Sequence, residues 1–425
     1  MLSVLDLRGK GSQVAGNLPA PTVPGADVAD AVSGIIADVK ARGDEALLDL
    51  TRRFDGVELG SLSIEPAAMA AALERIPPEL RRALEQAWER ILAYHAHEPS
   101  PLGAFEAEGT RVSHVDVPVD RAGCYAPGGR ARYPSSVLMC AAPARVAGVK
   151  EIVLCVPPAA DGKVDDATLA AASIAGIDVV HPVGGAQAIA AMAFGTQSVG
   201  RVDVIVGPGN AYVAEAKRQV AGSVGVASAF AGPSEIVVIA DSSTPADLAA
   251  IDLMVQAEHG PDGMAWLVTW EPDVVGAVEA SLARLIEVAP RREDLEATMA
   301  TAGVACIVDT PEAAMAVSNL IAPEHLELLV TDYQGLKDRV RAAGAVFCGI
   351  DAPASLGDYA AGPNHILPTH RSARFSSALR ADDFRRHIHV VEVSREGFEV
   401  LAPTVITLAE AEGLDAHAES IRLRR

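Results

Sequence analysis

An acidic and a basic side chain lie next to each other at Glu324 and His325, in the segment APEHL. The segment is expected to connect a helix to a strand, and an adjacent carboxylate and imidazole could there divide two proton transfers between them. Imidazole titrates near neutral pH, so His325 is the better candidate for a general base. A charged surface residue beside a hydrogen-bonded histidine would give the same sequence, so the pair alone leaves both interpretations open.

A second group of residues has the types that bind a divalent metal ion. Gln256 and His259, in QAEHG, are three positions apart, so they share one face of the last turn of an expected helix. Together His259, Asp358 and His417 could bind zinc, which takes imidazole and carboxylate ligands, whereas Gln256 would be an unusual oxygen donor. These residues are far apart in the chain, and a plain helix end is the simpler local interpretation of QAEHG.

Two further segments combine a carboxylate with a histidine. Asp358 and His365 share the Gly- and Pro-rich segment SLGDYAAGPNHILPT. Loops of this kind often carry function, although Asp is also a common turn former. Glu412 and His417 lie near the C-terminus in AEGLDAHAES, where a solvated helix face is the alternative.

Glycine-rich turns follow three of the expected strands, in the segments CYAPGG (124–129), VGGAQ (183–187) and GPGN (207–210). Glycines at such a turn let the backbone approach a phosphate, which the N-terminus of the next helix then faces. None of the three is a GxGxxG or a Walker A loop, and each could be an ordinary tight turn. Together they predict a dinucleotide crevice at the carboxyl edge of a sheet, where Tyr125 could stack on a base.

The elements that must position these residues are expected to form two α/β units. From about residue 118, short apolar runs alternate with helical segments, which indicates βαβ units and a parallel sheet. A second alternating block begins at EIVVIAD (235–241), so we expect two Rossmann-like sheets, and residues 26–97 should be helical. The tail beyond about residue 380 is a strand with helices too small for a core of its own, so it must pack on something else, such as a second subunit.

The composition excludes several classes of partner. The formal net charge is −21 and no cluster of Lys and Arg is present, which argues against nucleic-acid and anionic membrane surfaces. Five cysteines are scattered singly, which is typical of reduced thiols and a cytoplasmic protein. No signal peptide is evident, and the long uncharged stretch 179–200 is interrupted by His, Pro and Gly, so we expect strand, turn and helix there.

Several functions compete for this pattern. The residues by themselves indicate a dinucleotide-binding α/β enzyme with a possible zinc site. A cysteine-dependent aldehyde dehydrogenase would instead use Cys124 or Cys140, although Cys140 lies in an apolar helix where a packed thiol is expected. A regulatory nucleotide-binding module would need neither metal nor acid–base pair. A zinc hydrolase would leave the Gly-rich turns unexplained.

At these motifs the chain resembles the histidinol dehydrogenase family. The resemblance runs in order from about residue 118 to the C-terminus, through CYAPGG, VGGAQAIAAMAFGT, VDVIVGPGNAYVAEAKRQV, AGPSEIVVIAD, QAEHGPD, APEHLEL, SLGDYAAGPNHILPT and AEGLDAHAESIRLR. It implies a zinc-dependent oxidation of L-histidinol, through L-histidinal, to L-histidine, with reduction of two NAD, the last step of histidine biosynthesis.

The resemblance also implies a role for each candidate site residue. Zinc would be bound by Gln256, His259, Asp358 and His417. The acid–base pair would be Glu324 and His325. Substrate would be held by these metal ligands and His325 together with Ser234, His365 and Glu412. NAD would contact Tyr125, Gln187 and Asn210.

Finally, the resemblance implies a homodimer with shared active sites, in which the C-terminal tail reaches the partner's site. The expected organisation is a discontinuous first α/β domain (24–117 and 233–378), a Rossmann-like NAD-binding domain (118–232) and a small dimerisation extension (1–23 and 379–425). The expected fold class is therefore α/β, with two Rossmann-like parallel-sheet domains and a C-terminal strand–helix extension exchanged in a dimer.

Overall fold

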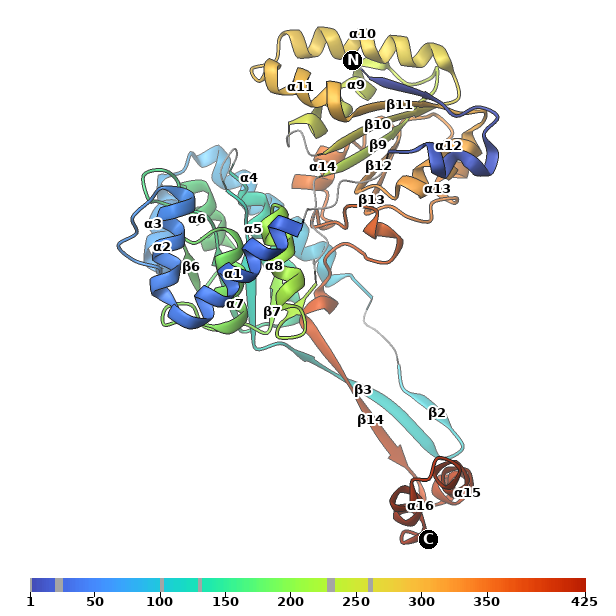
Figure 1. Cartoon of the computed structure of the whole chain (residues 1–425). Helices are drawn as coiled ribbons and strands as arrows, with labels where there is room; N and C mark the ends of the chain where they lie inside the picture. Colours follow the sequence, from blue (N-terminus) through green and yellow to red (C-terminus); the bar gives the residue numbers. More distant parts are fainter. Residues whose placement is uncertain (1, 20–25, 100–102, 129–131, 228–233, 259–262) are drawn as a thin grey trace.

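Two parallel β-sheets, each covered by helices, and a long antiparallel arm make up the chain (Figure 1). This computed structural model describes the 425 residues except 1, 20–25, 100–102, 129–131, 228–233 and 259–262. The arm leads away from both sheets and carries the last two helices at its far end. The two Rossmann-like sheets and the C-terminal strand–helix extension confirm the expected α/β fold class.

The first sheet has five parallel strands in the order β6-β5-β4-β7-β8. The chain adds strands first on one side of β4 and then on the other, and such a switch point is where Rossmann-like sheets bind nucleotides. The buried parts of β4, β5 and β7 are runs of small or apolar residues, as expected for parallel strands covered on both faces. Their bounds are β4 (Arg121–Tyr125), β5 (Glu151–Cys155), β6 (Val179–His181), β7 (Val204–Val206) and β8 (Gly225–Val226).

Helices cover both faces of this sheet in two layers. On one face, α5 (Pro134–Ala147) and α6 (Asp166–Ile174) share a core with α3 (Pro66–Arg75) and α4 (Pro78–Ala96). On the other face, the inner helices are α7 (Gly185–Phe194) and α8 (Ala211–Val220), and the outer ones are α1 (Ala26–Arg42) and α2 (Asp44–Asp55).

The packing of α1–α4 differs from the expected grouping of residues 24–117 with 233–378. Eight of the ten residues of α7 are buried, so this helix needs an apolar neighbour outside as well as the sheet inside. The outer helices supply that neighbour. Their apolar stripes are visible in the sequence, but the stripes do not say which sheet they cover.

The second sheet has six parallel strands in the order β1-β11-β10-β9-β12-β13. The first strand, β1, pairs with β11, so the start of the chain belongs to this sheet and not to the dimerisation extension expected for residues 1–23. β1 has only four residues, and it is a strand because it pairs with β11, which lies some 300 positions later in the chain. The bounds are β1 (Ser3–Asp6), β9 (Glu235–Ile239), β10 (Met264–Thr269), β11 (Gly303–Ile307), β12 (His325–Leu328) and β13 (Ala345–Cys348).

Helices also cover both faces of the six-stranded sheet. One core cluster contains residues of α9 (Ala246–Ala257), α10 (Pro272–Glu287), α11 (Arg292–Ala302) and the start of α14 (Ala354–Tyr359). The opposite cluster involves η1 (Gly11–Asn17), α12 (Pro311–Ile321) and α13 (Gln334–Lys337).

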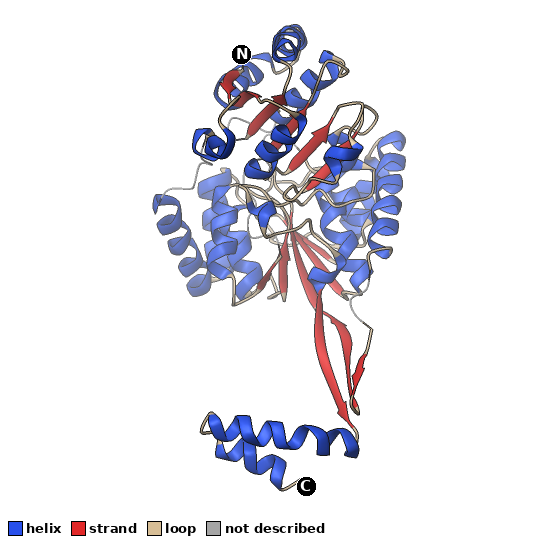
Figure 2. Ribbon diagram, turned by 90° about the vertical axis from the view of Figure 1, so that its right-hand side faces the viewer, coloured by secondary structure: helices blue, strands red, loops and turns tan. Residues whose placement is uncertain are grey.

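The arm is an antiparallel ribbon whose far end carries the C-terminal helices (Figure 2). Its central pairing runs from Arg385↔Pro118 to Val393↔Thr110. None of the helices in the described ranges is long and apolar enough to cross a bilayer. The elements of the arm are β2 (Phe105–Ala107), β3 (Thr110–Pro118), β14 (Arg385–Val393), α15 (Arg395–Ala411) and α16 (Asp415–Arg422). The short η2 (Ser372–Arg374) and η3 (Ala381–Phe384) come before β14.

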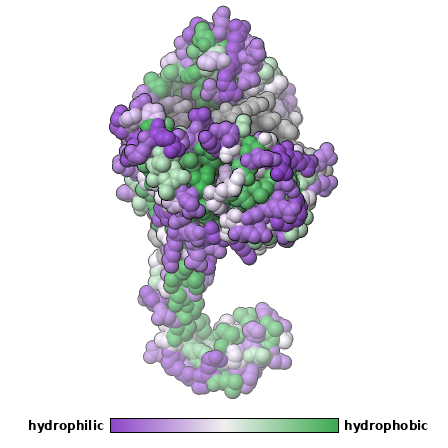
Figure 3. Space-filling model, turned by 90° about the vertical axis from the view of Figure 1, so that its left-hand side faces the viewer, coloured by the Kyte–Doolittle hydropathy of each residue, from purple (hydrophilic) through white to green (hydrophobic). Residues whose placement is uncertain are grey.

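Apolar side chains remain exposed along the arm and on its helices, where Figure 3 shows them as green patches. A helix pair this small cannot bury its apolar stripe within itself. The exposed residues are Phe105, Val115, Ile388, Val391, Val393, Val400, Leu401, Val405, Leu408, Leu414 and Leu423.

Candidate functional site

The amino edge of the six-stranded sheet carries the expected acid–base pair, Glu324 and His325. Glu324 directly precedes β12, His325 begins it, and Ser234 directly precedes the neighbouring strand β9. The backbone N–H of Glu235 donates to Oε2 of Glu324 at 3.2 Å, which ties the start of β9 to the pair. Parallel sheets usually bind ligands at the opposite, carboxyl edge, so the strand pattern alone would not point here.

Glu324 and His325 are both buried, and Oε2 of Glu324 lies 3.6 Å from Nδ1 of His325. Burial raises the pKa of Glu324 above its usual value, and the neighbouring imidazole only partly offsets this. Burial by itself would lower the pKa of His325, but the carboxylates of Glu324 and Asp358 outweigh it and raise that pKa to about 9. Nε2 of His325 lies 3.2 Å from Oδ1 of Asp358, so the imidazole is held between two carboxylates.

A chain of contacts joins this edge to the five-stranded sheet. Nδ1 of His365 donates to the carbonyl of Asp358 at 2.8 Å, and its Nε2 lies 3.2 Å from Oγ of Ser136. Ser136 is in the first turn of α5, which follows the carboxyl end of β4. The loop that carries His365 therefore connects the amino edge of one sheet with the carboxyl edge of the other.

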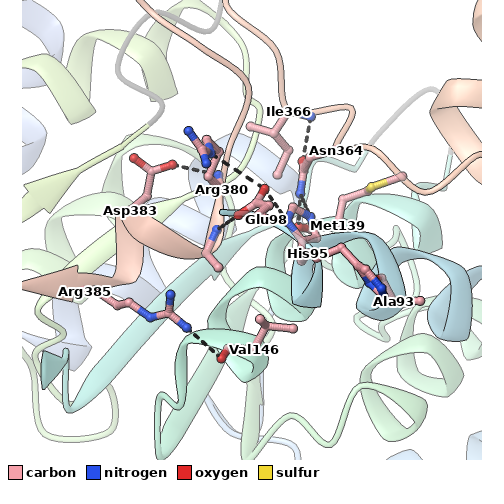
Figure 4. A network of polar contacts seen from close by, with 12 residues as sticks. Ala93, His95, Glu98, Met139, Val146, Asn364, Ile366, Arg380, Asp383 and Arg385 are labelled. Atoms are coloured by element: carbon pink, nitrogen blue, oxygen red, sulfur yellow. Dashed lines mark hydrogen bonds and ion pairs between the residues drawn. The ribbon is translucent and has the colours of Figure 1, made fainter. Parts of the chain in front are cut away.

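A buried polar network fixes the loop beside His365 (Figure 4). Nδ2 of Asn364 donates to the carbonyl of Met139 at 2.7 Å and lies 3.1 Å from Nε2 of His95. Nδ1 of His95 is in turn 3.0 Å from Oε1 of Glu98. Because α4 and α5 hold these partners, the position of His365 depends on helices of the other sheet.

Gln256, in the last turn of α9, presents one atom suited to a metal. Its Nε2 donates to the carbonyl of Ser234 at 2.6 Å, which leaves Oε1 as the oxygen that can coordinate a cation. A carboxylate oxygen of Asp358 and an amide oxygen suit a hard or borderline cation, and zinc accepts both with imidazole. The expected ligand His259 lies outside the described residues.

Two expected site residues are far from the others within one chain. Glu412 follows α15 and His417 lies in α16, beyond the end of the arm (Figures 1 and 2). Among the residues that the structure describes, no three His, Cys, Asp or Glu side chains gather closely enough to hold a metal ion. The described part of a single chain thus holds some of the expected donor set but not all of it.

The three expected NAD contacts lie at the carboxyl edge of the five-stranded sheet: Tyr125 ends β4, Gln187 is in the first turn of α7 and Asn210 precedes α8. The hydroxyl of Tyr125 accepts from the backbone N–H of Gly185 at 3.1 Å, next to the buried Gln187. Oδ1 of Asn210 caps α8 by accepting from Tyr212 N and Val213 N, both at 3.1 Å. These turns therefore present helix N-termini at one edge, which is how such folds receive a pyrophosphate.

The turn before α8 is built around a glycine and a buried lysine. Gly207 has φ +113°, and a Cβ there would lie 2.0 Å from the carbonyl oxygen of Tyr125. Nζ of the fully buried Lys217 donates to the carbonyl of Gly207. The desolvated amine therefore holds the turn against α8, and burial lowers its pKa to about 8.

The cysteines do not have the surroundings of a nucleophile. Cys124 is fully buried, and its contact with Cys140 together with burial raises its pKa well above the usual value. Cys140 is also buried, with Sγ 3.9 Å from the carbonyl of Tyr125. A reactive cysteine needs an accessible thiolate, so these contacts argue against a thiohemiacetal route.

Comparison with known proteins agrees with the motifs. The histidinol dehydrogenase family model matches residues 20–425. A histidinol dehydrogenase of Cupriavidus pinatubonensis is 48% identical over 402 residues, covering 93% of this chain and 90% of that protein. The chain belongs to the histidinol dehydrogenase family.

Further members of the histidinol dehydrogenase family show the same agreement. One from Neisseria gonorrhoeae is 46% identical over 397 residues, covering 92% of each chain. The crystal structure of histidinol dehydrogenase from Elizabethkingia anophelis superposes with a TM-score of 0.94 at 33% identity and covers 100% of this chain and 98% of that one. The similarity thus includes the arm and the C-terminal helices.

Sequence reasoning missed several polar residues that support the site. The sequence does contain a signal for two of them. Glu327 is two positions after His325 in the strand HLEL, so both face the same side of β12, and Asn364 directly precedes His365. The contacts of the others depend on packing that no local pattern shows. The missed residues are Ser136, Lys217, Glu235, Asp252, Glu327 and Asn364.

Proposed function

We propose that this chain oxidises L-histidinol through L-histidinal to L-histidine, with zinc bound and with reduction of two NAD. The observation that carries the proposal is the buried Glu324–His325 pair, joined through Asp358 and His365 to the sheet whose turns suit NAD. Membership of the histidinol dehydrogenase family supports the substrate.

His325 is the general base of both oxidations. In the first, its ring takes the hydroxyl proton of L-histidinol as hydride passes to NAD, which leaves the aldehyde. The Glu324 and Asp358 carboxylates, which raise the pKa of His325 to about 9, stabilise the imidazolium that forms, so the step starts from the deprotonated ring. The Asp358 carboxylate orients the ring.

Glu324 acts between the two oxidations. Its carboxylate takes a proton from water as the water oxygen bonds to the aldehyde carbon, while His325 returns its proton to the carbonyl oxygen, giving the hydrate and a neutral ring; Glu324 later releases its proton to solvent. His325 then removes a hydroxyl proton from the hydrate as the second hydride leaves, so one water and two NAD are consumed per histidine. Burial of the pair keeps the aldehyde away from bulk water between the steps.

The zinc ligands in this proposal are Gln256, His259 and Asp358 together with the partner subunit's His417. Zinc, when bound, supplies a positive charge that orients the imidazole and amine of the substrate. Ser234, His365 and the partner subunit's Glu412 hold the remaining substrate groups. Tyr125, Gln187 and Asn210 line the turns that receive NAD.

A homodimer follows from the same proposal. Each chain carries His417 beyond the end of its arm, and the exposed apolar side chains of α15 and α16 need a covering surface. Removing residues 395–425 should give a monomer in sedimentation analysis that loses activity. A truncated chain that stays dimeric and active would overturn the shared site. We also propose that the protein is cytoplasmic, which the five unpaired cysteines support.

The deciding experiment measures NADH formed from L-histidinol with and without a metal chelator. Two NADH per histidinol, lost on chelation and restored by zinc, is the expected result. One NADH per histidinol, or full activity in metal-free protein, would contradict the proposal. A regulatory nucleotide-binding module would bind NAD without turnover, and a hydrolase would form no NADH.

A further inference from the structure

Glu327 is a fully buried carboxyl that the proposed reaction does not use. On β12 the side chains alternate: Leu326 and Leu328 join the core on the α12 side, so His325 and Glu327 face the other side, towards α9 and α14. A buried acid costs free energy unless its oxygens are bonded. The contacts of Glu327 therefore indicate what it is retained for.

One of these contacts is made with α14. Oε1 of Glu327 accepts from the backbone N–H of Ala354 at 2.6 Å, and Ala354 is the first residue of α14. Asp358 lies one helical turn later in the same short helix. The bond thus fixes the amino end of the element that brings the Asp358 carboxylate to His325.

The other contact is made with α9. The Glu327 carboxyl forms a side-chain hydrogen bond with Asp252, which is buried in α9 one turn before Gln256. Two carboxyls can bond only when one of them keeps its proton. Burial raises the pKa of Glu327 most, and the nearby Asp252 carboxyl raises it further, to about 8. The pair therefore retains a proton at neutral pH.

We propose that Glu327 and Asp252 are positioning residues, whose hydrogen-bonded pair locks α9 and α14 onto β12 so that Gln256 and Asp358 converge beside His325. This inference rests on the proposed function, in which Gln256 and Asp358 bind zinc. Asp252 precedes Gln256 by one turn of α9, and Ala354, whose N–H Glu327 accepts from, precedes Asp358 by one turn of α14. Supporting residues of this kind commonly change metal affinity by about 10- to 100-fold when they are removed.

Two substitutions at Glu327 separate hydrogen bonding from volume. In Glu327→Gln, the amide oxygen can still accept from Ala354 N, and the amide nitrogen can donate to Asp252. Glu327→Leu keeps a similar volume but removes both bonds. Thr310→Val is the matched control, because Thr310 caps α12 on the opposite face of the same sheet, accepting from Ala313 N at 3.2 Å.

Zinc affinity is measured by competition with a chromophoric chelator, and KM and kcat are measured for L-histidinol and NAD. Glu327→Leu should weaken zinc binding by about tenfold or more and raise KM for L-histidinol, with KM for NAD unchanged. Glu327→Gln should stay within about threefold of wild type for each. Thr310→Val should lower the melting temperature without changing zinc affinity. Unchanged zinc affinity in Glu327→Leu, or an equal loss in Glu327→Gln, would overturn the proposal.

A measurement without zinc tests the positioning directly. Hydrogen–deuterium exchange of the peptides covering α14 and the end of α9 should be faster in metal-free Glu327→Leu than in metal-free wild type, and near wild type in Glu327→Gln. Equal exchange in all three proteins would overturn the inference even if zinc binds. If the three proteins differ in exchange as expected but the wild-type protein binds no zinc, the proposed function is contradicted, while the role of Glu327 in fixing the two helices remains supported.

Discussion

Oε2 of Glu324 lies 3.6 Å from Nδ1 of His325, and the opposite ring nitrogen of that histidine faces Asp358. Consecutive residues in a strand normally point to opposite faces, so this closeness depends on Glu324 lying just before β12 and not within it. The two side chains therefore lie side by side although they are consecutive in the chain.

Glu324→Gln should separate the two oxidations. The amide cannot take a proton from water, so turnover of L-histidinal should fall by about 10²- to 10⁴-fold, while the first hydride transfer from L-histidinol should continue. Single-turnover NADH formation from each substrate measures the two steps. An equal loss of both steps would mean that Glu324 does not act only on water.

Gly207→Ala should be far more damaging than Gly222→Ala. Both glycines have a left-handed backbone, with φ +113° and φ +93°, but a Cβ at Gly207 would strike the carbonyl of Tyr125, whereas one at Gly222 meets no atom within 4 Å. Strain alone costs about 1–3 kcal/mol. We expect Gly222→Ala to lose stability in that range with KM for NAD unchanged, and Gly207→Ala to lose more and to raise KM for NAD. Thermal unfolding and initial rates check both, and equal behaviour of the two variants would refute the role of the clash.

Asn364→Ala should weaken substrate binding through His365. The change leaves the carbonyl of Met139 and Nε2 of His95 without their shared donor, at a cost of about 1–3 kcal/mol. Asn319→Ala is the control, since Oδ1 of Asn319 also fixes a loop by accepting from the backbone N–H of Arg341 at 2.7 Å, but at an exposed position. KM for L-histidinol should rise only in Asn364→Ala. An unchanged KM in that variant would argue that the network serves stability alone.

His387 should make stability depend on pH at the base of the arm. Its Nδ1 lies 2.7 Å from Asp116 and its Nε2 2.9 Å from Asp382, and these hydrogen bonds raise its pKa above the usual value. A raised pKa means that the stabilisation is complete below the unfolded value of about 6.5 and is lost as pH rises through the folded value. The difference in melting temperature between wild type and His387→Asn should be largest near pH 6 and shrink at alkaline pH. A difference that grows with pH would contradict the assignment.

The sequence pattern predicts the strands and helices around the site well, because their signals are local. Alternating apolar runs and Gly-rich turns predict Tyr125 and Asn210 at the carboxyl edge of a sheet, and in the structure Tyr125 ends β4 and Asn210 lies between β7 and α8. The pairing of β1 with β11 and the packing of α1–α4 could not be predicted in this way, because both depend on which distant apolar surface is left uncovered.

The candidate site shows the same division between local and distant information. Glu324 and His325 are adjacent in the chain, so their backbones are always close, but their side chains meet only because Glu324 lies just before β12. The approach of Asp358 to His325 needs α14 to be placed by a buried bond from Glu327, and no spacing in the sequence reports that bond. The roles of His259 and His417 stay predictions, since one lies outside the described residues and the other lies beyond the end of the arm.

The pairing of β1 with β11 also sets an order of events during synthesis. The five-stranded sheet and its helices lie within residues 26–226, so they can form while the ribosome is still making the second sheet. Residues 3–6 must wait for residues 304–307, which at about 5–20 residues per second takes about 15–60 seconds. Until β1 docks, β11 has a bare apolar edge of the kind that recruits other chains, so aggregation of the nascent protein should depend on its first ten residues more than on any comparable surface segment.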